Sequence, residues 1–159
     1  MTLHRRVGYA AAMRLLSMAM VPSLCVSYSS NKGSVLSIAR LVSIVDDDEA
    51  VRLAMDTLVR SFGNETRLFS CAEEFLDSGL IAETAFLISD IMMPGMSGVA
   101  MLEYIRQLEY APPTLLMTAF PAAGLTEKAM ANGALAVLNK PVDPDTLSYW
   151  LATVLGSSH

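Results

Sequence analysis

The sequence predicts an α/β fold in which a parallel β-sheet is covered by helices on both faces. Three observations support this prediction: short apolar runs rich in β-branched residues have the length of buried strands, segments with helical periodicity follow them, and this pair repeats five times. Strands that alternate with helices of this length form parallel sheets. The expected strands are residues 41–45, 65–69, 85–89, 114–117 and 135–138.

The first two helices have recognisable ends. Residues 49–62 place apolar side chains on one stripe, Asp48 precedes them as an N-cap, and Gly63 stops the helix. A shorter helix is expected over residues 71–77, with Ser70 as its N-cap.

The other helices follow the third, fourth and fifth strands. A turn-rich stretch leads into a helix that carries Val99 on its apolar face. A helix over residues 125–131 ends at the pair Asn132 and Gly133, which is a favourable C-terminal cap. The last helix is expected over residues 145–155.

The charged residues divide the chain into two unlike parts. All 16 acidic residues lie from Asp46 onward, whereas residues 1–40 hold five of the 11 basic residues and no acid. The acidic part argues against nucleic acid as a direct partner, because it would repel phosphates. It suits a protein that collects a divalent cation. We therefore expect a leader over residues 1–40 and one domain over residues 41–156.

The leader has a basic start and a mostly apolar stretch, which is the outline of a signal peptide or a membrane anchor. Arg14 and Pro22 interrupt that stretch, so it lacks the unbroken run of about 20 apolar residues that a spanning helix needs. We expect a disordered leader or a mis-assigned start in preference to a membrane role. The two cysteines, Cys25 and Cys71, are too few for a disulfide framework and fit a reducing compartment.

Polar residues follow four of the predicted strands, at the sheet edge where such folds bind ligands. The first strand ends at Asp46 and Asp47, the third at Asp90, the fourth at Thr118 and the fifth at Lys140. Each has an ordinary explanation alone: an acid caps a helix, a threonine lies in a turn, and a lysine is solvated. Their convergence at one edge favours a functional site.

The residue types at this edge indicate phosphoryl transfer. Three carboxylates within a few ångströms raise one another's pKa values unless a cation neutralises them. Oxygen ligands of this kind select Mg²⁺, which also bridges carboxylate and phosphate. An aspartate can attack phosphorus and form an acyl phosphate. Mg²⁺, Lys140 and Thr118 would then compensate the charge of the added phosphoryl group.

Four segments resemble the receiver domains of bacterial response regulators, in particular those of the nitrogen-fixation and nodulation type. These segments are residues 45–48, 89–98, 117–119 and 140–141. The resemblance covers Leu41 to about Leu155, and its most specific part runs from Asp90 to Gly98. It implies a flavodoxin-like, doubly wound sheet of five β-α units with strand order 2-1-3-4-5.

The resemblance also implies a metal site and a phosphoacceptor. Asp90 would accept the phosphoryl group. Asp47 and Asp90 would bind Mg²⁺ through their side chains, Met92 would bind it through its backbone carbonyl, and Asp46 would bind it largely through water. The domain would carry out its own Mg²⁺-dependent phosphorylation and dephosphorylation without being a classical enzyme.

The resemblance gives the other two residues roles in holding and reading the phosphoryl group. Thr118 would hydrogen-bond a phosphoryl oxygen and move inward, and Lys140 would pair with the phosphoryl charge from a loop shaped by a cis bond to Pro141. Two positions depart from the family. Val137 stands where most members have the Tyr or Phe of the switch, and Val142 replaces the usual Phe after Lys-Pro. The chemistry is unaffected by either change. Movement of Thr118 is still expected to bias the face formed by the fourth helix, the fifth strand and the fifth helix, through a weaker or different switch.

The expected partners are proteins. Only four residues follow Leu155, so we expect no attached output domain and a signal that passes through a downstream effector protein. A sensor histidine kinase or a histidine phosphotransfer protein would be the phosphodonor. This chemistry is expected in the cytoplasm, with neither nucleic acid nor membrane as a direct partner.

Two other functions use part of the same set of residues. A phosphatase of the haloacid dehalogenase type also forms an aspartyl phosphate with Mg²⁺, but it uses an Asp-x-Asp-Gly motif. Residues 46–49 lack that glycine, and Asp90 would have no role. The alternative that remains is a pseudo-receiver, which folds in the same way but is never phosphorylated and serves as a docking module.

Overall fold

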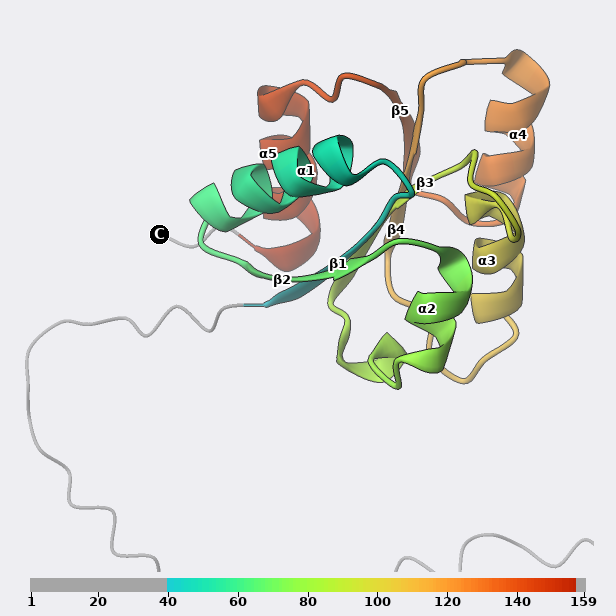
Figure 1. Ribbon diagram of the computed structural model, residues 1–159, viewed down its shortest axis with the longest axis horizontal. Helices are drawn as coiled ribbons and strands as arrows, with labels where there is room; N and C mark the ends of the chain where they lie inside the picture. The colour runs from blue at the N-terminus through green and yellow to red at the C-terminus, as the bar shows by residue number, and fades with distance from the viewer. Residues whose placement is uncertain (1–39, 157–159) are drawn as a thin grey trace, which may run out of the picture. The chain divides into compact units, whose positions relative to one another are not determined.

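The computed structural model describes residues 40–156, so all of the expected leader except Arg40 lies outside the described residues. These residues form one five-stranded parallel sheet in the order β2-β1-β3-β4-β5, which confirms the predicted fold class and strand order (Figure 1). The strands are β1 (Leu41–Val45), β2 (Glu65–Phe69), β3 (Phe86–Asp90), β4 (Thr114–Thr118) and β5 (Ala136–Asn139).

Helices cover both faces of the sheet. Helices α1 and α5 lie together on one face, and α2, α3 and α4 lie on the other (Figure 1). The helices are α1 (Glu49–Ser61), α2 (Ala72–Asp77), α3 (Gly98–Ile105), α4 (Ala123–Ala131) and α5 (Pro144–Leu155), with a short 3₁₀ turn η2 (Ile81–Glu83) that the sequence did not predict. Among residues 40–156, no helix combines the length and the apolar character needed to span a bilayer.

The strands alternate their side chains between the two helical layers, as the period of a strand requires. Ile44 and Ile88 pack into the core beneath α1 and α5, whereas Val45 and Leu87 pack into the core beneath α2 and α3. All four side chains are buried. Because both faces of the sheet are covered, the central strands are apolar runs rather than alternating ones.

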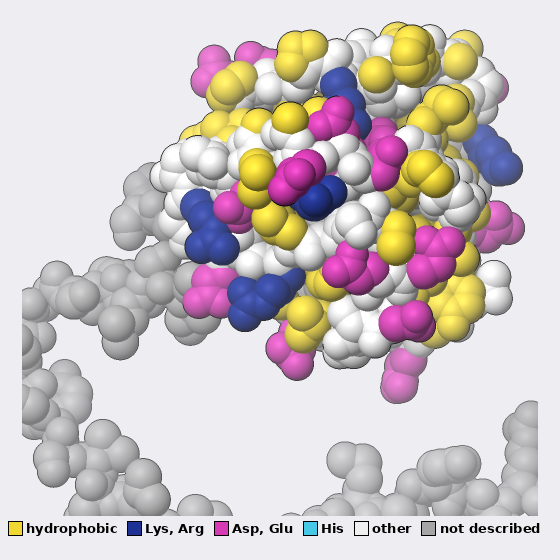
Figure 2. Space-filling view, in the orientation of Figure 1, with side chains coloured by type: hydrophobic (Ala, Val, Ile, Leu, Met, Phe, Trp, Pro, Cys, Tyr) yellow, Lys and Arg dark blue, Asp and Glu magenta, His cyan; other side chains and the backbone are white. Residues whose placement is uncertain are grey.

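The surface of this domain carries more acidic than basic side chains. Figure 2 shows acidic groups spread over the visible face, with fewer Lys and Arg side chains between them. This distribution agrees with the sequence, in which all 16 acids of the chain lie from Asp46 onward. The visible face therefore offers no broad basic patch of the kind that binds nucleic acid.

The helix ends agree with the sequence in three cases and disagree in one; Gly63 follows the C-cap of α1 with a positive φ of 83°, as its predicted role as a helix stop requires. Asp48 is the N-cap of α1, and Gly133 follows α4 with a positive φ of 88°. The prediction of Ser70 as N-cap of α2 is wrong, because Cys71 holds that position without a side-chain cap. Ser70 instead donates its N–H and its hydroxyl to Glu74 Oε2, at 2.7 and 2.9 Å. The charged Glu74 carboxylate is a stronger acceptor than a neutral group, so it holds the Ser70 hydroxyl and keeps it away from the N-cap position.

Strands β3, β4 and β5 each end one residue later than predicted, and β3 and β5 also begin one residue later. Asp90 pairs with Met117 in the sheet, and the Thr118 carbonyl accepts the N–H of Lys140 at 2.8 Å. The two polar residues therefore belong to the strands themselves. The strand order reverses between β1 and β3, so the carboxyl ends of these neighbours open the crevice in which such sheets bind ligands.

Candidate functional site

Three aspartates meet at the carboxyl ends of β1 and β3. Asp46 and Asp47 follow the last residue of β1, and Asp90 is the last residue of β3. Each offers a carboxylate oxygen, and these oxygens lie within 4.8 Å of one another. Asp46 and Asp90 are buried, whereas Asp47 is exposed. The cluster therefore opens to solvent on the Asp47 side.

Asp46 is held from three directions. Its Oδ1 accepts the N–H of Asp48 at 2.9 Å, and its backbone carbonyl accepts a hydrogen bond from Arg52 Nη1 at 2.6 Å. Its Oδ2 is buried and lies 2.7 Å from Lys140 Nζ, but the contact lacks the alignment of a hydrogen bond. A buried carboxylate oxygen without an aligned donor has coordination capacity left for a cation.

Lys140 brings an ammonium group into the cluster. It follows β5, its peptide bond to Pro141 is cis as predicted, and its Nζ lies 2.7 Å from Asp46 Oδ2 and 3.2 Å from Asp90 Oδ1. Burial opposes the charged form of this lysine. The contact with Asp46 and the negative charges of Asp46 and Asp90 outweigh burial, so the pKa of Lys140 is raised and the ammonium stays protonated.

Asp90 is the acid whose ionisation is opposed. Burial raises the pKa of Asp90 most, and the negative charge of Asp46 adds to this, while Lys140 acts in the opposite direction. Within the described residues, the three carboxylates of the cluster face a single ammonium. A hard divalent cation such as Mg²⁺ would neutralise the excess negative charge through the oxygen ligands that it prefers, so the donor set fits Mg²⁺.

Thr118 stands at the end of β4, the strand beside β3. It is buried, and its hydroxyl oxygen accepts the N–H of Phe120 at 3.1 Å. The hydroxyl therefore has its own proton free to donate to a group that enters the crevice. Thr118 thus lies at the predicted edge, but no hydrogen bond joins it to the carboxylates among the described residues.

The loop after Asp90 is tied down at both ends. Ile91 donates its N–H to Met117 O at 2.8 Å, and its own carbonyl accepts the N–H of Gly98 at 2.9 Å. Met92, which follows, lies in this loop and is 59% exposed as a residue. Its apolar side chain cannot bind Mg²⁺, so only its backbone carbonyl is left for the predicted role.

Glu73 and Arg52 contribute to the site but were missed by the sequence analysis. Glu73 Oε1, on α2, accepts the N–H of Met96 at 2.9 Å and so fastens the loop after β3 to α2. Hydrogen bonds from its own backbone N–H and from Met96 lower the pKa of Glu73. Arg52 lies on α1, six residues beyond Asp46, and donates a hydrogen bond to the Asp46 carbonyl. In the sequence, only this spacing pointed to that hydrogen bond.

Val137, which departs from the family pattern, lies on β5 in the layer formed by α3 and α4. It is partly buried and packs against the core cluster that contains Ile91, Val99 and Leu116. A valine fills far less volume than the aromatic side chain usual at this position.

The fold and the acidic crevice define a flavodoxin-like protein with carboxylates gathered at the reversal point of its sheet. The family model for the response regulator receiver domain matches residues 42–151, and the chain belongs to this family. This finding confirms the resemblance inferred from the sequence.

Individual relatives agree with this assignment. The transcriptional regulatory protein FixJ of Bradyrhizobium diazoefficiens is 31% identical over 114 residues, which are 72% of this chain and 56% of FixJ. Nodulation protein W of the same organism is 33% identical over 101 residues, or 64% of this chain and 44% of that protein. The chain thus spans about half the length of these curated relatives.

Solved structures support the fold. A response regulator receiver protein from Pseudoalteromonas atlantica superposes with a TM-score of 0.69, over 75% of this chain and 99% of that one. The two sequences are 19% identical, so this likeness concerns the fold alone.

Proposed function

We propose that this receiver domain accepts a phosphoryl group on Asp90, with Mg²⁺ held by the carboxylate cluster. The observation that carries the proposal is the meeting of Asp46, Asp47 and Asp90 with the ammonium of Lys140 at one strand edge. Mg²⁺ bound there would neutralise the carboxylates and the incoming phosphoryl group.

Each residue has a definite task in this proposal. A carboxylate oxygen of Asp90 attacks the phosphorus of a phosphohistidine, the P–N bond breaks, and the imidazole leaves. Asp47, Asp90 and the Met92 carbonyl would hold Mg²⁺, and Asp46 would contact it largely through water. Lys140, already 3.2 Å from Asp90 Oδ1, would pair with the phosphoryl oxygens.

Thr118 completes the set as a hydrogen-bond donor to the phosphoryl group. Its hydroxyl proton is not committed by the bond from Phe120, in which the threonine oxygen is the acceptor. A donor that is free before phosphorylation and bonded after it can move with the phosphoryl group. This supports the proposed role of Thr118 in transmitting the signal.

The donor and the recipient of the signal follow from this chemistry. We propose a sensor histidine kinase or a histidine phosphotransfer protein as the donor, an effector protein as the recipient, and the cytoplasm as the place. The proposed domain remains residues 41–156. A pseudo-receiver is the second candidate, because Val137 lacks the usual aromatic ring, but the complete set of polar residues favours phosphorylation.

The first experiment is intact-mass measurement after incubation with acetyl phosphate and Mg²⁺. We expect a gain of one phosphoryl group in the natural chain and in Asp77→Asn, which removes an exposed acid outside the cluster. The gain should be absent from Asp90→Asn and in the presence of a chelator. A folded natural chain that gains no mass would establish the pseudo-receiver instead.

A further inference from the structure

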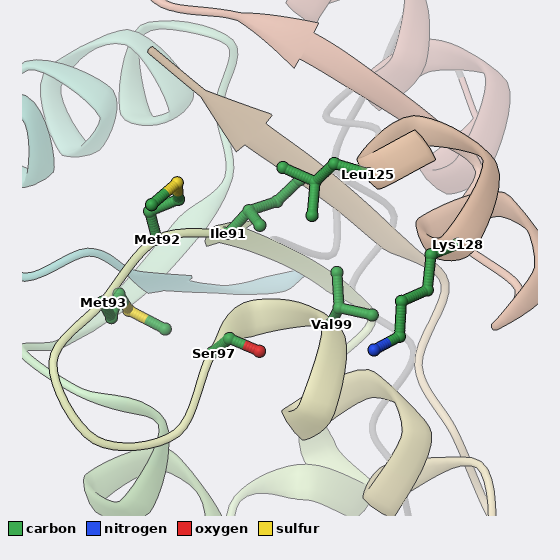
Figure 3. A pocket seen from close by; sticks show the side chains of 7 residues that line it. All are labelled: Ile91, Met92, Met93, Ser97, Val99, Leu125 and Lys128. Atoms are coloured by element: carbon green, nitrogen blue, oxygen red, sulfur yellow. The ribbon is translucent and has the colours of Figure 1, made fainter. Parts of the chain in front are cut away.

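A cavity of about 380 Å³ lies between the loop after β3, the start of α3 and the helix α4 (Figure 3). It is separate from the carboxylate cluster, since none of the three aspartates lines it. The lining residues are Ile91, Met92, Met93, Ser97, Val99, Leu125 and Lys128.

The walls of this cavity are apolar and anchored in the core. Ile91 and Val99 are almost fully buried and belong to the core cluster beneath α3 and α4, against which Leu125 packs from α4. Figure 3 shows the side chains of Ile91, Val99 and Leu125 turned toward the same space. The cavity is therefore a preformed apolar site with walls from three segments.

Lys128 supplies the one charge in the lining. Its side chain extends from α4 toward Val99, so the ammonium lies near the α3 side of the cavity (Figure 3). No acid lines the cavity, and within residues 40–156 Lys128 forms no ion pair. Lys128 is exposed, so its attraction for an anion is modest and local, and it acts against the negative charge of the rest of the domain. Beside apolar walls without an acid, it nevertheless favours an anionic group over a cationic one at this place.

We propose that this cavity binds a small organic acid with an apolar body and one carboxylate. The volume lies in the lower part of the range of small-molecule sites, roughly 300–1,000 Å³. The apolar body would lie against Ile91, Val99 and Leu125, and the carboxylate would pair with Lys128. The Ser97 hydroxyl accepts the N–H of Ala100 and keeps its own proton for a second bond to the carboxylate.

The cavity shares a wall with the proposed phosphorylation site. Ile91, Met92 and Met93 line it, and they follow Asp90 directly in the chain. An occupant would therefore contact the same loop whose Met92 carbonyl is proposed to bind Mg²⁺. Binding of the acid and binding of Mg²⁺ would change each other's affinity by the same factor, a consequence that rests on the proposed function.

Binding is tested without any phosphodonor, by NMR titration of the full chain with 2-naphthoate and with 2-naphthylmethylammonium. Both probes have the same apolar body, but their charges are opposite. We expect shifts of the Ile91, Val99 and Leu125 methyl groups, and tighter binding of naphthoate by about fivefold, the value of a partly exposed ion pair. Equal affinities, shifts located elsewhere or no binding of naphthoate would overturn the proposal.

Variants separate the role of Lys128 from a general charge effect. Lys128→Gln should abolish the preference for naphthoate, Lys128→Arg should retain it, and Arg60→Gln should leave it unchanged. Arg60 is an exposed cation on α1, which covers the opposite face of the sheet. An equal loss in Lys128→Gln and Arg60→Gln would attribute the preference to net charge and refute the site.

The coupling is tested by repeating the naphthoate titration with saturating Mg²⁺. We expect the affinity for naphthoate to change in the natural chain and to stay constant in Asp90→Asn. Naphthoate binding that is insensitive to Mg²⁺ refutes the coupling alone. A chain that binds naphthoate but never gains a phosphoryl group refutes the proposed function and keeps the binding site.

Discussion

Gly98 is a position where any side chain conflicts with the backbone that carries Asp90. A Cβ atom there would lie 2.2 Å from the Asp90 carbonyl oxygen and 3.1 Å from the Ile91 Cα. Both are backbone atoms, so a rotamer change cannot relieve the contact. The absence of a side chain lets the loop return to the end of β3 and lets the Gly98 N–H bond to Ile91 O.

Gly98→Ala is therefore expected to destabilise the domain by about 1–3 kcal/mol, the usual cost of forcing extra atoms into a packed region. Urea unfolding measures this change. Gly124→Ala is the matched control, because Gly124 lies on α4 and a methyl group there would meet no atom within 4 Å. The control should gain up to about 1 kcal/mol from the helix preference of alanine. Equal changes in the free energy of unfolding for the two substitutions would show that contact with the Asp90 backbone does not cause the destabilisation.

Among single residues, the sequence predicted the polar groups at the ends of the strands. It missed Glu73 and Arg52, which hold the neighbouring backbone by hydrogen bonds. Asp46, Asp90 and Lys140 could be predicted because the ends of parallel strands share one edge of a sheet. The contact of Glu73 with Met96 joins residues 23 positions apart, and it depends on how α2 packs. No local pattern encodes such a contact.

The junction of α1 and β2 contains an ion pair whose strength depends on pH. Asp56 Oδ1 accepts hydrogen bonds from Thr66 Oγ1 on β2 and from Arg60 Nε, the latter at 2.7 Å. The hydrogen bond from Thr66 lowers the pKa of Asp56 most, and Arg60 lowers it further against the effect of burial. The ionised carboxylate therefore fastens the second half of α1 to the edge strand.

Because the pKa of Asp56 is lowered on folding, its ionised form stabilises the folded chain above the ordinary value of 3.8, and this stabilisation is lost as pH falls below that value. We expect Asp56→Asn to lower the free energy of unfolding by about 1 kcal/mol near neutral pH. The difference from the natural chain should shrink in acid below pH 3.8. Urea unfolding across this range measures it, with Asp77→Asn as the control; parallel curves for Asp56→Asn and the natural chain would contradict the assignment.

Helix α4 and strand β5 form the pair of elements expected to respond to phosphorylation despite Val137. Addition of beryllofluoride, a phosphoryl mimic, should change the backbone NMR shifts of Thr118 and of residues along α4 and β5. Thr118→Val keeps the shape of the side chain but removes the hydroxyl, and it should confine the changes to the loops around Asp90. Changes that stay confined to these loops in the natural chain would show that no switch reaches this face.

For the domain taken together, binding of Mg²⁺ should stabilise the fold, because the folded chain alone brings the three carboxylates into one cluster. At a free Mg²⁺ concentration about 100 times the dissociation constant, the free energy of unfolding should rise by about 2.7 kcal/mol. Thermal unfolding with Mg²⁺ or with a chelator measures this rise. Asp47→Asn should remove the effect with little change to the metal-free chain, since Asp47 is exposed. A rise of equal size in Asp47→Asn would place the ion elsewhere.

The architecture was predictable because strands and helices alternate with clear periodicity, and the strand order followed from the family resemblance. The 3₁₀ turn η2 was not predictable, since three residues carry no periodic signal. The cavity beneath α4 was not predictable either. Its walls come from segments more than 25 residues apart, and its volume depends on side-chain packing.

The parallel pairing of β1 and β3 gives the site a further property. Val45 lies opposite Ser89, so the residues that follow them, Asp46 and Asp90, emerge side by side. Successive side chains of a strand point to opposite faces, and a slip of one residue would send Asp90 to the other side of the sheet. A misregistered or partly folded chain would thus be unable to take up a phosphoryl group. If Asp90 is phosphorylated as proposed, a loss of phosphorylation would therefore report an error in strand register as well as a change at the site itself.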